Sequence, residues 1–199
     1  VHAEGQRFAR QRQEADGSIG EEVPPRLTQS PPPTKQPQII VLDTGGQYCH
    51  LITRKIRELG IYSEIRPSET PAAELAGARG IVISGGPSSV YEPGSPQVDP
   101  AIFELPVAVL GLCYGHQLIA WHLGGAVHHG EKGEYGMAHF ETLGEAPLFK
   151  QASGHQQIWM SHRDTVTAVP PGFSLYGSTE TCAIAAMGEA AYLRAGHAR

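Results

Sequence analysis

A cysteine between two glycines is the residue of this sequence best placed to do chemistry. Cys113 follows the apolar run Pro106–Leu112 and precedes the amphipathic run His116–Leu123, with Gly111 and Gly115 two residues away on either side. The first run predicts a buried strand and the second a helix. A nucleophile on a tight turn from strand to helix forms an elbow that exposes its side chain. The helix N-terminus is then expected to lower the pKa of the thiol and favour the thiolate.

The alternative for Cys113 is a buried core residue, because free cysteines are among the most buried residue types. The flanking glycines and the switch from strand to helix favour the nucleophile.

The elements that must position this cysteine alternate between strand and helix. Short apolar runs at Ile39–Leu42, Ile61–Ile65 and Gly80–Ser84 predict strands buried on both faces. The run Tyr48–Leu59 has helical spacing and ends at Gly60, a typical C-terminal cap. The pattern predicts an α/β fold, a flavodoxin-like doubly wound, mostly parallel sheet with helices on both faces. Its ligand site should lie at the carboxyl ends of the strands.

Two loops fall at that edge of the predicted sheet, Asp43–Gln47 and Ser84–Tyr91. A glycine-rich loop after a strand can cradle phosphate or aim backbone N–H groups at an oxyanion. No Gly-Lys-Ser/Thr follows the second loop, and Pro87-Ser88 stands where a pyrophosphatase-type ATP loop needs aspartate. The elbow on the next strand favours the oxyanion role over a phosphate site or a plain turn.

The second half of the chain predicts more strands and little helix. We expect a short helix or turn at Glu145–Phe149, a short helix at Ala72–Leu75, and strands at Ala126–His128, Met137–Thr142, Gln157–Met160, Phe173–Gly177 and Thr181–Met187.

Two groups of residues have metal-binding side chains, but neither predicts a metal site. His128 and His129 lie near Glu131, yet neighbouring strand residues point to opposite faces and cannot easily bind one ion. Cys113 and His116 have ligand-like spacing without a second pair. We therefore expect no metal in this domain.

Composition narrows the function classes further. The 199 residues carry a net charge of -5, and the pI is near 6.0, so there is no electrostatic footprint for nucleic acid. Three cysteines argue against a disulfide framework and for a reducing, cytoplasmic location. No apolar run is long enough for a membrane span, and no signal-peptide core is present at the start.

The chain divides into three parts by composition. Residues 1–37 are rich in Glu, Gln, Arg and Pro, which predicts a disordered leader, with a targeting or linker segment as the alternative. The predicted domain covers 38–187. From 188 to 199 the pattern is lost, and we expect an aberrant or disordered tail.

The motif Gly111-x-Cys113-x-Gly115-x-Gln117 resembles the nucleophile motif of class I (triad-type) glutamine amidotransferases. Within that family the chain is most similar to the GMP synthase (glutamine-hydrolysing) branch. The similar stretches are Ile40–Tyr48, Leu51–Leu59, Ser84–Tyr91, Leu110–Gln117, Trp159–Asp164 and Ala183–Met187.

The resemblance implies a mechanism. The Cys113 thiolate would attack the side-chain amide of glutamine and form a glutamyl thioester. Backbone N–H groups of Gly86 and Tyr114 would hold the oxyanion. Gln117 lies one helical turn from Cys113, on the same face. The positions implied to bind glutamine are Gln117 and the backbone around Ser161, Arg163 and Asp164.

The resemblance also implies a partner. Ammonia would pass to a synthetase (ATP-pyrophosphatase) domain or subunit that uses ATP and Mg²⁺ to convert XMP to GMP. The amidotransferase domain itself would need no cofactor, and neither nucleic acid nor membrane is an expected partner.

One departure from the family concerns the catalytic base. The family triad needs His and Glu in a late Gly-x-Gln-Phe-His-Pro-Glu stretch, which the 199 residues do not contain; His197 has no Pro-Glu after it. We therefore expect a C-terminally truncated or frame-shifted domain that is inactive or weak alone. Thr44 is a milder departure, since the family commonly has an aromatic residue there.

The missing base leaves an alternative function open, a non-catalytic subunit that binds glutamine or docks on a partner. A different hydrolase with a cysteine elbow is disfavoured by the two loops.

Overall fold

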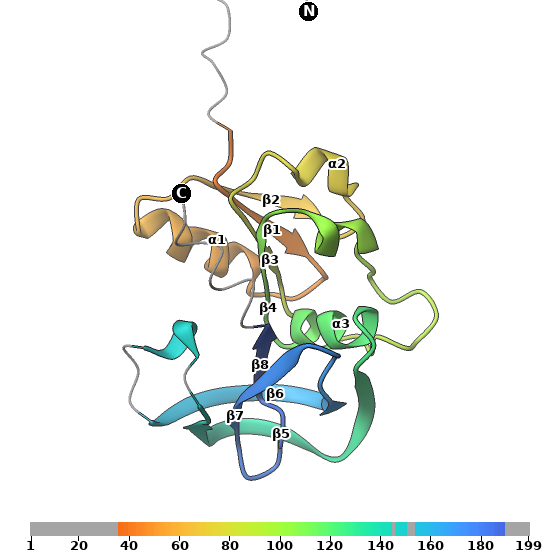
Figure 1. Cartoon of the computed structure of the whole chain (residues 1–199), viewed down its shortest axis with the longest axis vertical. Helices are drawn as coiled ribbons and strands as arrows, with labels where there is room; N and C mark the ends of the chain where they lie inside the picture. The colour runs from red at the N-terminus through yellow and green to blue at the C-terminus, as the bar shows by residue number, and fades with distance from the viewer. Residues whose placement is uncertain (1–35, 145, 151–153, 190–199) are drawn as a thin grey trace, which may run out of the picture. The chain divides into compact units, whose positions relative to one another are not determined.

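The computed structural model describes residues 36–144, 146–150 and 154–189 (Figure 1). The predicted leader, up to residue 35, and the tail from 190 onward lie outside the described residues. The elements are β1 (Ile39–Asp43), α1 (Cys49–Glu58), β2 (Ser63–Pro67), α2 (Ala72–Leu75), β3 (Gly80–Ile83), η1 (Pro100–Glu104), β4 (Ala108–Gly111), α3 (Tyr114–His122), β5 (Ala126–Thr142), η2 (Pro147–Phe149), β6 (His155–Ala168), β7 (Phe173–Ser178) and β8 (Ala186–Glu189).

The first half of the described chain forms a parallel sheet of four strands in the order β2-β1-β3-β4 (Figure 1). Val41 and Val82 point to the face covered by Cys49 of α1. Their strand neighbours Ile40 and Ile81 point to the opposite face, where α2, η1 and α3 pack. Both faces of the sheet are thus buried by helices, which confirms the predicted doubly wound fold.

The second half of the described chain forms an antiparallel sheet in the order β6-β5-β7-β8. The two strands predicted at Ala126–His128 and Met137–Thr142 are one long strand, β5, whose register with β6 shifts between His129 and Glu134. Three glycines, at 130, 133 and 136, make this stretch read as a loop in the sequence. The sheet pairing overrides that local signal.

Strand β8 continues past residue 187, where we expected the domain to end. Gly188 and Glu189 pair with Ser174 and Phe173 and belong to β8. This last strand was expected to begin at Thr181, but residues 181–185 form a loop, and β8 begins at Ala186.

Helix boundaries differ from the prediction by one or two residues. The first helix begins at Cys49 rather than Tyr48, and Gly60 follows it with φ +78, as expected for a C-terminal cap. Helix α3 begins at Tyr114, directly after the cysteine, and contacts β4, β5 and β6. Within the described residues, no helix combines the length and apolar character that a membrane crossing requires.

Candidate active site

Cys113 has the backbone geometry of a nucleophile elbow. Its φ is 49 and its ψ is -108, and no other non-glycine residue among those described has a positive φ. It is the N-cap of α3, and its side chain is exposed. A strained backbone that presents a thiol to solvent is the arrangement that the sequence predicts for a nucleophile.

The two flanking glycines are required by close backbone contacts. A Cβ at Gly115 would lie 2.3 Å from the carbonyl oxygen of Ile83, and a Cβ at Gly111 would lie 2.4 Å from the carbonyl carbon of Gly115. The Gly115 N–H also donates to the Ser84 carbonyl, at 3.1 Å. The elbow is therefore held directly against the end of β3, where no larger residue fits.

Thr44 fastens the two glycine-rich loops to one another. It is fully buried; its N–H donates to Ser84 Oγ at 3.1 Å and its hydroxyl lies 3.0 Å from the Gly85 carbonyl oxygen. A Cβ built on Gly85 would lie 3.5 Å from the Cβ of Cys113. An aromatic residue in place of Thr44 would keep the backbone N–H but would lack the Cβ hydroxyl that bonds to the Gly85 carbonyl. The sequence departure at this position thus has a structural role.

The expected oxyanion donors are backbone neighbours of the cysteine. Tyr114 is the first residue of α3, so its N–H has no acceptor within the helix. Its buried side chain donates from the hydroxyl to the Pro96 carbonyl at 2.6 Å, which anchors this end of the helix. Gly86 directly follows Gly85, which packs on the elbow. The oxyanion role of both N–H groups stays a prediction.

Gln117 is joined to β6. Its side chain is 6% exposed, and Nε2 donates to the Asp164 carbonyl at 2.8 Å. The same carbonyl accepts from His162 Nδ1 at 3.0 Å. This carbonyl already has two donors, so glutamine would have to use other groups of the stretch.

The other predicted binding residues divide between the two faces of β6. Ser161 and Arg163 are exposed, whereas Asp164 is buried on the face toward α3. The Asp164 carboxylate accepts from Tyr91 Oη at 3.1 Å and His129 Nδ1 at 3.2 Å. The sequence analysis named Tyr91 in the second loop and weighed His129 as a metal ligand, but it did not predict that either contacts Asp164, which lies 73 and 35 residues away along the chain.

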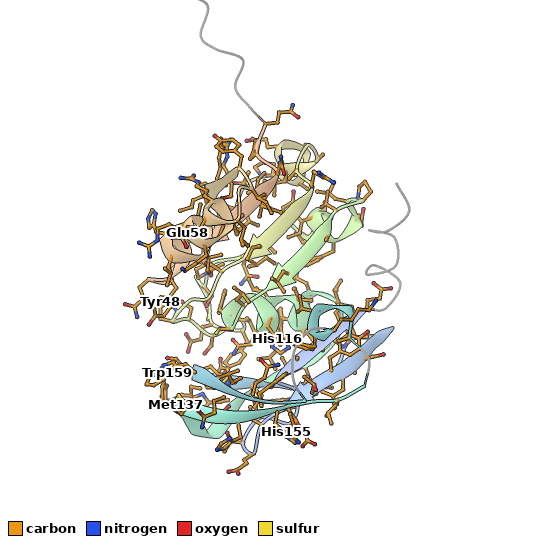
Figure 2. All side chains as sticks on the ribbon, turned by 90° about the vertical axis from the view of Figure 1, so that its left-hand side faces the viewer. Tyr48, Glu58, His116, Met137, His155 and Trp159 are labelled. Atoms are coloured by element: carbon orange, nitrogen blue, oxygen red, sulfur yellow. The ribbon has the colours of Figure 1, made fainter. Side chains whose placement is uncertain are left out.

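The thiol environment differs from the expected one. Cys113 is exposed as a residue, but the protein atoms packed around its sulfur disfavour the thiolate, so burial raises the pKa of the thiol, although we expected a lowered one. Among the described residues, none forms a hydrogen bond with its Sγ. His116, one turn away, lies where α3 meets the second sheet (Figure 2). Burial, and then His162, lower the pKa of His116 to about 4, which makes it a weak base.

A cysteine elbow at the carboxyl edge of a doubly wound sheet defines a class of α/β enzymes with a thiol nucleophile. The family model described as "Glutamine amidotransferase class-I" matches residues 40–194. The chain therefore belongs to the class I glutamine amidotransferase family.

Within this family, the chain is similar to proteins that are named GMP synthase. "GMP synthase [glutamine-hydrolyzing]" of Symbiobacterium thermophilum is 48% identical over 154 residues, which are 76% of this chain and 30% of that protein. The protein of the same name from Pyrobaculum aerophilum is 48% identical over 152 residues, with 75% and 30% covered. The chain thus spans about 30% of the length of these relatives.

Solved structures show the same fold. The crystal structure of a candidate GMP synthase subunit from Thermoplasma acidophilum superposes with a TM-score of 0.70 at 30% identity and covers 77% of this chain and 78% of its own. A glutamine amidotransferase from Thermotoga maritima has a TM-score of 0.61 at 19% identity, with 78% and 72% covered.

Proposed function

We propose that this chain is the glutamine-binding, thioester-forming domain of a GMP synthase. The observation that carries the proposal is the elbow: Cys113 at positive φ on the N-terminus of α3, packed on Gly85 and one turn from Gln117. Similarity to glutamine-hydrolysing GMP synthases gives glutamine as the substrate.

The reaction follows from the elbow. The Cys113 thiolate adds to the amide carbon of glutamine, and the N–H groups of Gly86 and Tyr114 stabilise the negative oxygen. The carbon–nitrogen bond breaks, and ammonia leaves with the proton of the thiol. Water then hydrolyses the thioester to glutamate and regenerates the thiol.

We expect proton transfer from the thiol to limit the reaction rate in this chain. Burial raises the pKa of Cys113, and among the described residues no base contacts its sulfur. Loss of a general base costs about 10²–10⁴ in rate. We therefore propose slow turnover. The same observation favours the second candidate function, a subunit that binds glutamine without hydrolysing it.

The relatives' length supports a synthetase partner. They extend well beyond the part that this chain matches. Tyr135, Met137 and Trp159 are 67%, 63% and 70% exposed on β5 and β6, and Met137 pairs with Trp159 (Figure 2). An exposed apolar patch of this kind marks an interaction site. We propose that the synthetase, with its ATP and Mg²⁺, docks there. The three free cysteines support a cytoplasmic location.

Intact-mass measurement after incubation with a glutamine-mimicking chloroketone tests the proposal. We expect one adduct, absent in Cys113→Ala and retained in Cys49→Ala and Cys182→Ser, because only Cys113 is exposed. Added glutamine should slow the labelling. No adduct on the folded chain, or labelling that glutamine does not slow, would refute a formed glutamine site. Steady-state release of ammonia then separates slow turnover from binding alone.

A further inference from the structure

Three metal-binding side chains meet between the second sheet and the loop before β8. A carboxylate oxygen of Glu134, a ring nitrogen of His162 and the sulfur of Cys182 all lie within 4.8 Å of one another. Glu134 on β5 and His162 on β6 are directly paired across the sheet. None of the three belongs to a sequence pattern that we associated with a metal.

The spacing of these atoms suits a small tetrahedral ion. Bonds of about 2.0–2.3 Å place tetrahedral ligand atoms about 3.3–3.8 Å apart. Glu134 and His162 already approach to 3.3 Å, between Oε2 and Nε2. Small side-chain movements would therefore bring all three atoms onto one ion.

Each candidate ligand is oriented by a further hydrogen bond. Metal-binding side chains in proteins are commonly held in this way. The supports are His162 Nδ1 to the Asp164 carbonyl at 3.0 Å, the Thr179 hydroxyl to Glu134 Oε1 at 2.8 Å, and the Thr165 hydroxyl 3.3 Å from Cys182 Sγ.

The positions of the protons on His162 leave two acceptor atoms facing each other, and a cation between them would satisfy both. A carbonyl only accepts, so Nδ1 of His162 carries the proton, and in the neutral ring Nε2 presents a lone pair. That lone pair faces Glu134 Oε2, a buried oxygen that accepts no hydrogen bond from any described residue. The two groups repel unless a proton or a metal ion lies between them.

We propose that Glu134, His162 and Cys182 bind one divalent transition-metal ion, with water as the fourth ligand. Mixed oxygen, nitrogen and thiolate ligands fit Zn²⁺ best. Burial raises the pKa of the Cys182 thiol, so binding releases its proton to solvent. The Glu134 and His162 side chains are 12% and 13% exposed, which leaves a narrow entry path. The ion would tie the loop that carries Cys182 to the strand that carries Asp164.

Metal titration of the full, reduced and chelator-treated chain tests this site independently of glutamine chemistry. We expect one Zn²⁺ per chain, and with Co²⁺ a thiolate charge-transfer band in the near ultraviolet. Both should persist in Cys113→Ala and Cys49→Ala, which keep Cys182. Cys182→Ser should lose the band and bind Zn²⁺ at least about 100-fold more weakly, beyond the usual loss for a merely supporting residue.

Glu134→Gln keeps the test decisive if other variants misfold. Its amide can donate to His162 Nε2, so the metal-free variant should melt no lower than the wild type. Zn²⁺ should raise the melting temperature of the wild type but not of this variant. A cobalt–thiolate band that persists in Cys182→Ser, no metal binding, or equal Zn²⁺ effects on both proteins would overturn the site in favour of a simple imidazolium–carboxylate pair.

Discussion

At the scale of single residues, Cys113 and His116 show how burial acts on titratable groups beside the elbow. Burial disfavours the charged form of each, so the pKa of the thiol is raised and that of the imidazole is lowered. Both groups are therefore neutral near pH 7. The thiol needs a base that His116 does not supply.

His116 should make the fold sensitive to acid. Its pKa falls from 6.5 to about 4 on folding, so the unfolded state binds more protons between these values. Stability is then fully present above pH 6.5 and is lost as pH falls toward 4. We expect acidification toward pH 4 to lower the free energy of unfolding by roughly 2–3 kcal/mol. This loss should be smaller in His116→Met, which has no imidazole to protonate.

Urea unfolding at a series of pH values measures this loss. His50→Gln, at an exposed position of α1, is the control and should keep the wild-type pH dependence. Equal slopes for His116→Met and the wild type would contradict the assignment.

The strained backbone of Cys113 should cost stability that a glycine recovers. A residue with φ 49 and ψ -108 lies outside the regions that side-chain-bearing residues prefer. We expect the free energy of unfolding of Cys113→Gly to be about 1 kcal/mol larger than that of Cys113→Ala, because both variants lack the thiol and only glycine relieves the strain. Equilibrium denaturation compares the two. A less stable glycine variant would show that the elbow is unstrained.

At the scale of elements, the site depends on how closely α3 approaches β3. The contact between Gly115 and Ile83 sets that approach and holds the Ser84–Gly86 loop beside the elbow. Gln117 then fixes the same helix to β6 of the second sheet. Strand β3, the Ser84–Gly86 loop and strand β6 thus together position α3 and the thiol at its N-terminus.

Gly115→Ala should disrupt this approach. The added Cβ would lie 2.3 Å from a backbone oxygen, which cannot move without shifting β3. We expect a loss of about 3 kcal/mol or more in the free energy of unfolding, together with loss of chloroketone labelling. In Gly77→Ala the new Cβ would lie 3.7 Å from a side-chain oxygen of Gln36, so this control should remain near the wild type. A stable, labelled Gly115→Ala would contradict the packing.

At the scale of the whole described domain, the parallel sheet ends in an open edge. Among the described strands, β4 pairs only with β3. An apolar groove of about 450 Å³ lies beside it, and its lining includes Leu110, Phe173 and Met187. Unpaired edges with apolar surroundings favour association between chains.

We expect the chain to self-associate through this edge. Leu110, 39% exposed on β4, is a position where a charge would oppose strand pairing. Leu110→Lys should shift the light-scattering mass toward the monomer. Leu59→Lys, at a position 77% exposed after α1, should leave it unchanged. A monomeric wild type, or equal effects of both variants, would refute association at this edge.

Local patterns in the sequence determined the parallel half of the fold and the elbow at Cys113. Apolar runs, helical spacing and the glycines around Cys113 are signals within a few residues, and they placed the first four strands and α3 within two residues of their observed ends. The long β5 was missed, because its glycines are atypical of a strand until β6 pairs with them.

Only the tertiary structure decided which distant side chains meet. Tyr91, His129 and Asp164 come together through sheet pairing and the return of β6 to α3, as do Glu134, His162 and Cys182. These residues lie far apart along the chain, so no local pattern in the sequence predicts that they come into contact. The environment of Cys113 is likewise a tertiary property, because burial raises the pKa of its thiol, whereas the local strand-to-helix pattern predicted a lowered one.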